Sequence, residues 1–331
     1  MLDRGSIKLH VDRHLCAALD VLPLRVRESF EGLLRQRRLL TPDPAPYFQP
    51  LGHPLFELPA WVAARLGEEG VDMPDEVVSD VLGVSVLGYL HVRAQDDWLD
   101  GAAREDPGLV ALAEALLALS HRLLVSVVGS SPRFWAFYAE VMTAYAGSLL
   151  RADELRKGAA PIRRSDFEQL LAQSRPLAIP AAALLDRADR WDLLGSLEEF
   201  VFAATAASQL VNDLTDLYRD RTNGHRTWTL EVVGASQADQ LWTEVAGSTS
   251  GQTGQLHQRI EEALSFHERS ARAAHALAPT AAGGWIIDRR AMLEALLGDL
   301  RGSLLNAFVA RLARPTGRAE QLQDPREEPA L

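Results

Sequence analysis

Residues 80–100 read DVLGVSVLGYLHVRAQDDWLD, a long apolar stretch that ends in three acids. We expect a helix over residues 75–100, because Pro74-Asp75-Glu76 places a proline and two acids in a first helical turn. On that helix Asp96 and Asp100 share one face, whereas Asp97 points about 100° away. Acids at a helix C-terminus repel one another and oppose the helix dipole, so a cation should offset their charge.

A second acidic row follows another apolar segment. Residues 212–220 read NDLTDLYRD, in which Asn212, Asp216 and Asp220 recur at every fourth position. On a helix these three side chains would form a straight row about 12 Å long. Amide and carboxylate oxygens are hard donors that suit Mg²⁺ and not a thiophilic metal.

A plainer interpretation of both rows stays open. Acids near helix ends are usually solvated surface charges, and Arg93, Arg104 and Arg219 lie close enough in the sequence to pair with them. Two such rows at the ends of two very apolar helices favour the metal-binding interpretation.

The rest of the chain is helical in pattern, because Ala and Leu dominate and alternating strand patterns are scarce. We expect a single all-α domain of about ten helices over residues 20–312, after an N-terminal segment at 1–19 and before a disordered tail at 313–331. The expected helices are 24–38, 59–68, 75–100, 108–128, 132–155, 166–174, 178–188, 195–220, 236–246, 256–278 and 285–312.

Composition excludes several classes of protein. The 331 residues are 47% hydrophobic and carry a formal net charge of −11, which argues against a nucleic-acid partner. No run approaches the ~20 apolar residues of a membrane span. Cys16 is the one cysteine, which excludes an internal disulfide framework and a zinc site of several thiolates. We expect a soluble cytoplasmic protein.

The two acidic rows resemble the two metal-binding motifs of the class I isoprenoid (terpene) synthase superfamily. The first row matches DDxxD in full, and the second matches its motif with substitutions at Asn212, Asp216 and Asp220. The resemblance implies a helical bundle around a central apolar cavity, a prenyl diphosphate substrate, a homodimer and three Mg²⁺ ions. The implied metal ligands are Asp96, Asp97, Asp100, Asn212, Asp213, Asp216 and Asp220.

The same resemblance implies where the diphosphate binds. Arg175 lies in QSRPLAIP, residues 173–180, which resembles the broken helix that carries a diphosphate-sensing Arg or Lys in this superfamily. Arg226 lies in GHRT, similar to the Gly-Lys-x-Thr segment of prenyltransferases. Arg219 and the pair Arg289-Arg290 are weaker candidates. A kinked helix with a solvated arginine is the structural alternative for Arg175.

Aromatic side chains could line the apolar cavity, where their faces favour a cation, or simply fill the core. Tyr89 is the one that we assign to the substrate. The others are Trp98, Phe134, Trp135, Tyr138, Tyr145, Phe200, Phe202 and Trp285. His91, on the first acidic helix, has two interpretations: a base late in the reaction, or a hydrogen-bonded core histidine.

Within the superfamily the sequence favours a terpene synthase, a carbon–oxygen lyase that ionises a prenyl diphosphate and then cyclises or quenches the cation. Chain elongation needs a second diphosphate site, but Arg35-Gln36-Arg37-Arg38 lacks the glycines expected there, and Arg104 is the one arginine soon after Asp100. Three alternatives stay open: a squalene/phytoene-type synthase, a chain-elongating synthase, and a non-catalytic regulatory subunit of a prenyl synthase.

Overall fold

The computed structural model describes residues 2–48, 54–99, 106–158, 160–233 and 252–312, and within these ranges every regular element is a helix. The prediction of an all-α protein is therefore confirmed. The α-helices are α1 (Arg4–Val21), α2 (Leu24–Gln36), α3 (Glu57–Glu68), α4 (Asp75–Leu99), α5 (Pro107–Val128), α6 (Pro132–Lys157), α7 (Arg164–Leu170), α8 (Ile179–Arg187), α9 (Leu194–Thr222), α10 (Trp228–Val233), α12 (Gln252–Leu277) and α13 (Gly283–Leu312). Short 3₁₀ helices are η1 (Ala45–Tyr47), η2 (Leu171–Ala178) and η3 (Trp191–Leu193).

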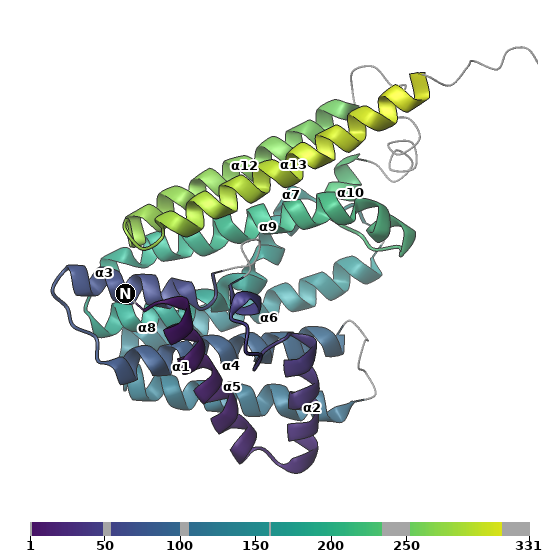
Figure 1. Ribbon diagram of the computed structural model, residues 1–331. Helices are drawn as coiled ribbons and strands as arrows, with labels where there is room; N and C mark the ends of the chain where they lie inside the picture. The colour runs from purple at the N-terminus through teal and green to yellow at the C-terminus, as the bar shows by residue number, and fades with distance from the viewer. Residues whose placement is uncertain (1, 49–53, 100–105, 159, 234–251, 313–331) are drawn as a thin grey trace, which may run out of the picture.

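The helices α4 and α5 pack against each other along their length, and α1 and α2 cross them on one side. On the other side of the bundle α9 packs against α12, and α12 and α13 form a long antiparallel pair above it (Figure 1). The broken segment η2–α8 lies between these two halves, where it contacts α4, α6 and α9.

Helix α4 begins and ends close to where its sequence pattern predicts. Asp75 and Glu76 occupy its first turn, and the helix continues to Leu99. Four of its central residues are 0% exposed, namely Val81, Leu82, Val86 and Leu90. The helix is therefore buried on more than one face. Helices that are apolar all round are typical of a protein core.

The N-terminal segment differs from its prediction. We expected residues 1–19 to precede the domain, but Arg4–Val21 form α1, and Asp3 accepts a hydrogen bond from the Ser6 amide as its N-cap. Ile7, Val11 and Leu15 are buried against the same core as α4. Their spacing of four residues is the helical signal that could have predicted this element.

The predicted break in the helix around residue 175 is confirmed. The chain changes from α-helix to 3₁₀-helix at Leu171 and returns to α-helix at Ile179, with Pro176 inside η2 and Pro180 in the first turn of α8. Proline lacks an amide hydrogen and cannot continue an α-helical ladder, so the two prolines account for the change. The predicted helix at 236–246 and the predicted disordered tail at 313–331 lie outside the described residues.

Two helices, α4 and α5, are long and apolar enough to cross a membrane by length and composition alone. The most apolar window of α4 is 67% buried within the protein and that of α5 is 39% buried. Core helices often pass such a test, and α4, which is mostly buried and packs against α5, is a helix of this kind.

Gly83 provides a test of the packing around α4. A Cβ at this position would lie 2.7 Å from both His14 Cγ of α1 and Leu123 Cδ1 of α5, whereas a Cβ at Gly88 would meet nothing within 4 Å. We expect Gly83→Ala to lower the free energy of unfolding, because overpacking costs about 1–3 kcal/mol. Gly88→Ala should be neutral or stabilising, since alanine favours a helix by about 1 kcal/mol. Thermal or denaturant unfolding of both variants checks this, and equal stabilities would contradict the packing described.

Candidate active site

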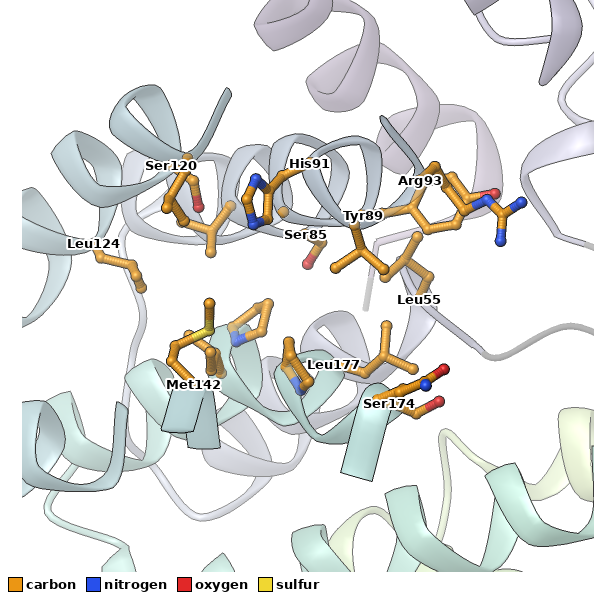
Figure 2. A pocket seen from close by; sticks show the side chains of 18 of the residues that line it. Leu55, Ser85, Tyr89, His91, Arg93, Ser120, Leu124, Met142, Ser174 and Leu177 are labelled. Atoms are coloured by element: carbon orange, nitrogen blue, oxygen red, sulfur yellow. The ribbon is translucent and has the colours of Figure 1, made fainter. Parts of the chain in front are cut away.

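A cavity of about 220 Å³ lies between α4 and α5 on one side and α6, η2 and α8 on the other. Apolar side chains from these helices make up most of its wall, including Val84, Leu117, Leu124, Met142 and Leu177. Figure 2 shows side chains of α4 and α5 on one side of this space and side chains of the broken helix η2 on the other. An apolar cavity at the end of the first acidic helix agrees with the sequence prediction.

One end of the cavity is polar. Arg93 and Asp96 of α4 line it together with Gln173 and Ser174 of η2. In Figure 2, Arg93 and Ser174 lie at the opposite end of the space from Leu124. The cavity therefore has an apolar interior and one end where a cation, an acid and two neutral hydrogen-bonding groups meet.

Arginines offset the charge of the first acidic row. Arg93 Nη1 donates to Asp96 Oδ2 at 2.9 Å, and Arg37 Nη2 donates to both oxygens of Asp97 at 2.9 and 3.2 Å. Asp97 lines a second groove, beside α2, and not the apolar cavity. Asp96 and Asp97 point in different directions from α4, as predicted: Asp96 lines the apolar cavity and Asp97 lines the α2 groove. Asp100 lies outside the described residues.

The second acidic row lies near the C-terminal end of α9. Asn212 is exposed, Asp216 is half-buried and pairs with Arg219, and Asp220 is buried with its Oδ1 3.5 Å from His225 Nδ1. Among the described residues that line the apolar cavity, none belongs to α9. The row keeps accessible oxygens at Asn212 and Asp216.

Asp213 occupies a different environment from its neighbours in the row. It is 3% exposed and accepts hydrogen bonds from Gln209 Nε2 at 2.8 Å and from Thr229 Oγ1 at 3.0 Å. Burial raises the pKa of this carboxyl to about 6, against the opposing effect of the two hydrogen bonds. Asp213 thereby links α9 to α10, a structural contact that the sequence does not reveal.

Arg175 does not line the apolar cavity. Its Nη2 donates to Glu140 Oε1 at 2.8 Å and to Glu198 Oε1 at 2.6 Å, in a separate pocket that also contains Gly195 and Phe202. The neighbouring Gln173 and Ser174 face the cavity instead. The sequence located the broken helix but not which of its side chains face the cavity.

Arg226 is engaged by backbone oxygens. Its guanidinium donates to three carbonyl oxygens near the end of α6, those of Leu155 (3.1 Å), Gly158 and Ala160. It also donates to Glu231 Oε1 at 2.6 Å. The carbonyl contacts satisfy oxygens at the end of α6 and in the segment that follows it, and the Glu231 contact is with α10, so Arg226 joins that end to α10.

The two arginines of α13 have different surroundings. Arg289 is fully buried, donates to the Ala204 carbonyl at 3.1 Å and to Ser208, and lies 4.9 Å from the centre of the Trp285 ring. Arg290 is exposed and donates to Glu294 Oε1 at 2.9 Å. Arg289 therefore connects α13 to α9.

The predicted aromatic lining is found in part. Tyr89 and Tyr138 line the cavity. Phe134, Phe200 and Trp285 are buried in the largest apolar core cluster, and Trp98 is 40% exposed. Among the aromatic residues named here, more fill the core than line the cavity, as the second sequence interpretation allowed.

Three residues at the polar end were not predicted as part of a site: Arg93, which we expected only as a surface partner of the acids, Gln173 and Ser174. Arg93 precedes Asp96 by three residues, a spacing that places two side chains on one helical face, and this was the available signal. Gln173 and Ser174 gave no such signal, because they lie in a 3₁₀-helix. A 3₁₀-helix has about three residues per turn, so the α-helical spacing does not predict which of its side chains face the cavity.

The acids of the two rows have the chemistry that Mg²⁺ prefers, with oxygen donors and partial exposure at Asp96 and Asp216. In the described part of the chain no three acidic, histidine or cysteine side chains are grouped closely enough to hold an ion by themselves. An ion at Asp96 would take further oxygen ligands from a bound substrate or water, as is usual where one or two carboxylates bind Mg²⁺.

No protein-family model matches this chain, and no curated protein matches it. Two solved structures of T. brucei FPPS are similar to it in fold. The unliganded structure has a TM-score of 0.51 at 12% identity, with 93% of this chain and 100% of that one covered. The complex with 1-(carboxymethyl)-1H-benzo[g]indole-2-carboxylic acid has a TM-score of 0.50 at 12% identity, with 94% and 100% covered. The predicted isoprenoid synthase fold is confirmed.

The contacts of Arg226 predict a structural effect of its removal. Arg226→Ala should lower the free energy of unfolding by about 1–3 kcal/mol, because several carbonyl oxygens and Glu231 lose a charged donor. Arg219→Ala is the matched control, since Arg219 is 65% exposed and its one ion pair among the described residues is with Asp216 of the same helix, where such a pair contributes less than about 1 kcal/mol. Thermal unfolding of both variants decides the matter, and an unchanged melting temperature for Arg226→Ala would contradict its role at the end of α6.

Proposed function

We propose that this protein is a Mg²⁺-dependent class I terpene synthase that ionises a linear prenyl diphosphate, releases diphosphate, and lets the allylic cation cyclise or be quenched. The observation that supports this most is the apolar cavity with Asp96 and Arg93 at its polar end. A prenyl chain matches the apolar interior, and a diphosphate matches the end where charge is available.

The chemistry follows from the two ends of the cavity. When the carbon–oxygen bond breaks, both electrons leave with the diphosphate, and positive charge remains on the allylic carbons. Arg93 lies where it can donate to the departing oxygens. Such a cation survives only where water is excluded, and the walls of this cavity are largely apolar. The faces of Tyr89 and Tyr138 favour a cation beside them.

Mg²⁺, when bound, would supply positive charge that stabilises the departing diphosphate. We assign its ligands to the two rows, foremost the partly exposed Asp96 and Asp216. Asp97, Asn212 and Asp220, with Asp100 from the sequence motif, complete the proposed set. Asp213 stays in the assignment as a weaker member, because its carboxyl is held by Gln209 and Thr229.

A chain-elongating prenyltransferase is the second candidate, and one contact favours it. Arg37, at the end of α2, and Arg93 both donate to Asp97, which brings two guanidinium groups to the first acidic row. Chain elongation needs a second diphosphate site, and Arg37 would be part of it. The likeness to FPPS at 12% identity concerns the fold and does not choose between the two reactions.

One assay separates the candidates. The purified chain is incubated with geranyl, farnesyl, geranylgeranyl or geranylfarnesyl diphosphate and Mg²⁺, with and without isopentenyl diphosphate, and diphosphate release and products are measured. A terpene synthase releases diphosphate and forms a hydrocarbon or alcohol from one substrate alone, and EDTA abolishes both. Product formation that requires isopentenyl diphosphate would support the elongating enzyme. A regulatory subunit would release no diphosphate, and its melting temperature would not rise with Mg²⁺ and diphosphate.

Substitution of the acids tests the assignment of ligands. We expect Asp96→Asn and Asp216→Asn each to lower diphosphate release by at least about a hundredfold, because charge stabilisation of a leaving group is typically this large. Asp189→Asn is the matched control: Asp189 is 86% exposed, pairs with Arg133, and has a positive φ that asparagine tolerates. Retained turnover by either site variant would contradict the assignment.

A further inference from the structure

His91 lies on the wall of the apolar cavity, on the same side as Ser85 and Ser120 (Figure 2). Its side chain comes from α4, five residues before Asp96, which is about 7.5 Å along the helix axis. The residue is 3% exposed, so the protein encloses it almost completely. His91 therefore combines burial in the core with a position on the cavity wall.

The partner of His91 fixes its tautomer. His91 Nδ1 lies 2.9 Å from the carbonyl oxygen of Ala113 on α5. A carbonyl only accepts, so Nδ1 carries the hydrogen and donates it. In a neutral ring the other nitrogen, Nε2, then holds a lone pair, and no hydrogen bond to it is found within the described part of the chain.

Burial keeps the ring neutral. It lowers the pKa of His91, against the smaller opposing effects of the Ala113 carbonyl and of Glu114. His121, whose Nε2 is hydrogen-bonded to the Tyr138 hydroxyl, also has a pKa lowered by burial. His121 does not line the cavity itself, and the polar groups that do line this part of the wall, His91, Ser85, Ser120 and Tyr138, are uncharged at neutral pH, which suits a cavity that holds a carbocation.

We propose that His91 is the base that ends the reaction by removing a proton from the carbocation, an inference that rests on the proposed function. The Nε2 lone pair forms a new N–H bond, and the electrons of the broken C–H bond become the π bond of the product. His91 is then an imidazolium, which returns the proton to water when the product leaves. Electrons and charge balance without any other reactant.

The other polar groups of the wall are weaker candidates for this step. Ser85 Oγ donates to the Val81 carbonyl, and the hydroxyls of Ser120 and Tyr138 are neutral oxygens, which are much weaker bases than an imidazole nitrogen. The released diphosphate is a stronger competitor, but it would lie at the polar end with Arg93 and Asp96. His91 lies farther from that end and can act on carbons of the prenyl group that are more distant from the diphosphate.

His91→Asn is the variant that tests this, because an asparagine amide can still donate to the Ala113 carbonyl while Nε2 is lost. His91→Gln, which keeps more of the volume, is the second variant if the first fails to fold. His267→Asn is the matched control, since His267 is 2% exposed but lies on α12 away from the cavity. Each protein is assayed with Mg²⁺ and the prenyl diphosphate that the wild-type chain accepts.

The expected result separates the two halves of the reaction. Diphosphate release by His91→Asn should stay within about threefold of wild type, while the yield of the wild-type olefin per diphosphate released falls at least about tenfold, in favour of alcohols or isomeric olefins. An unchanged product profile, or a fall in release with the product ratio preserved, would overturn the role of His91. If the wild-type chain releases no diphosphate from any substrate, the proposed function itself is wrong, which is a different result.

Discussion

The burial of α4 on several sides is the constraint on which the rest of the structure depends. Its central residues pack against α1, α5 and α8, and Gly83 lets α1 and α5 approach closely. Because the helix is held along its length, the direction of its last two turns is fixed as well. Arg93 and Asp96 therefore reach the cavity while Asp97 reaches α2.

The broken helix η2–α8 supplies the opposite wall. Pro176 prevents a continuous α-helix, and the resulting 3₁₀ segment turns Gln173, Ser174 and Leu177 toward the cavity and Arg175 away from it. A regular helix would present a different set of side chains. The polarity of one end of the cavity thus depends on a local interruption of the backbone as well as on the acids of α4.

Several charged side chains in the described part of the chain have a specific partner. Arg93 and Arg37 neutralise the first acidic row, and Arg226 satisfies carbonyls where α6 ends. The Arg93–Asp96 pair is compatible with the proposed reaction, because both side chains are partly exposed. In that reaction Asp96 would bind a metal ion and Arg93 would bind the substrate, in place of the ion pair between them. Asp213 is different, since its buried hydrogen bonds serve the contact between α9 and α10.

The sequence by itself determined the helical class, the two acidic rows and the break near Arg175, because composition, spacing and proline act locally along the chain. The spacing of three residues also places Arg93 and Asp96 on one face of one helix. Tertiary structure alone decided that Arg175 meets Glu140 and Glu198, that Arg226 meets the end of α6, and that α1 belongs to the core. The physical reason is that a charged side chain takes its partner from the helix packed beside it, and helix packing is set by apolar burial between segments far apart in the chain.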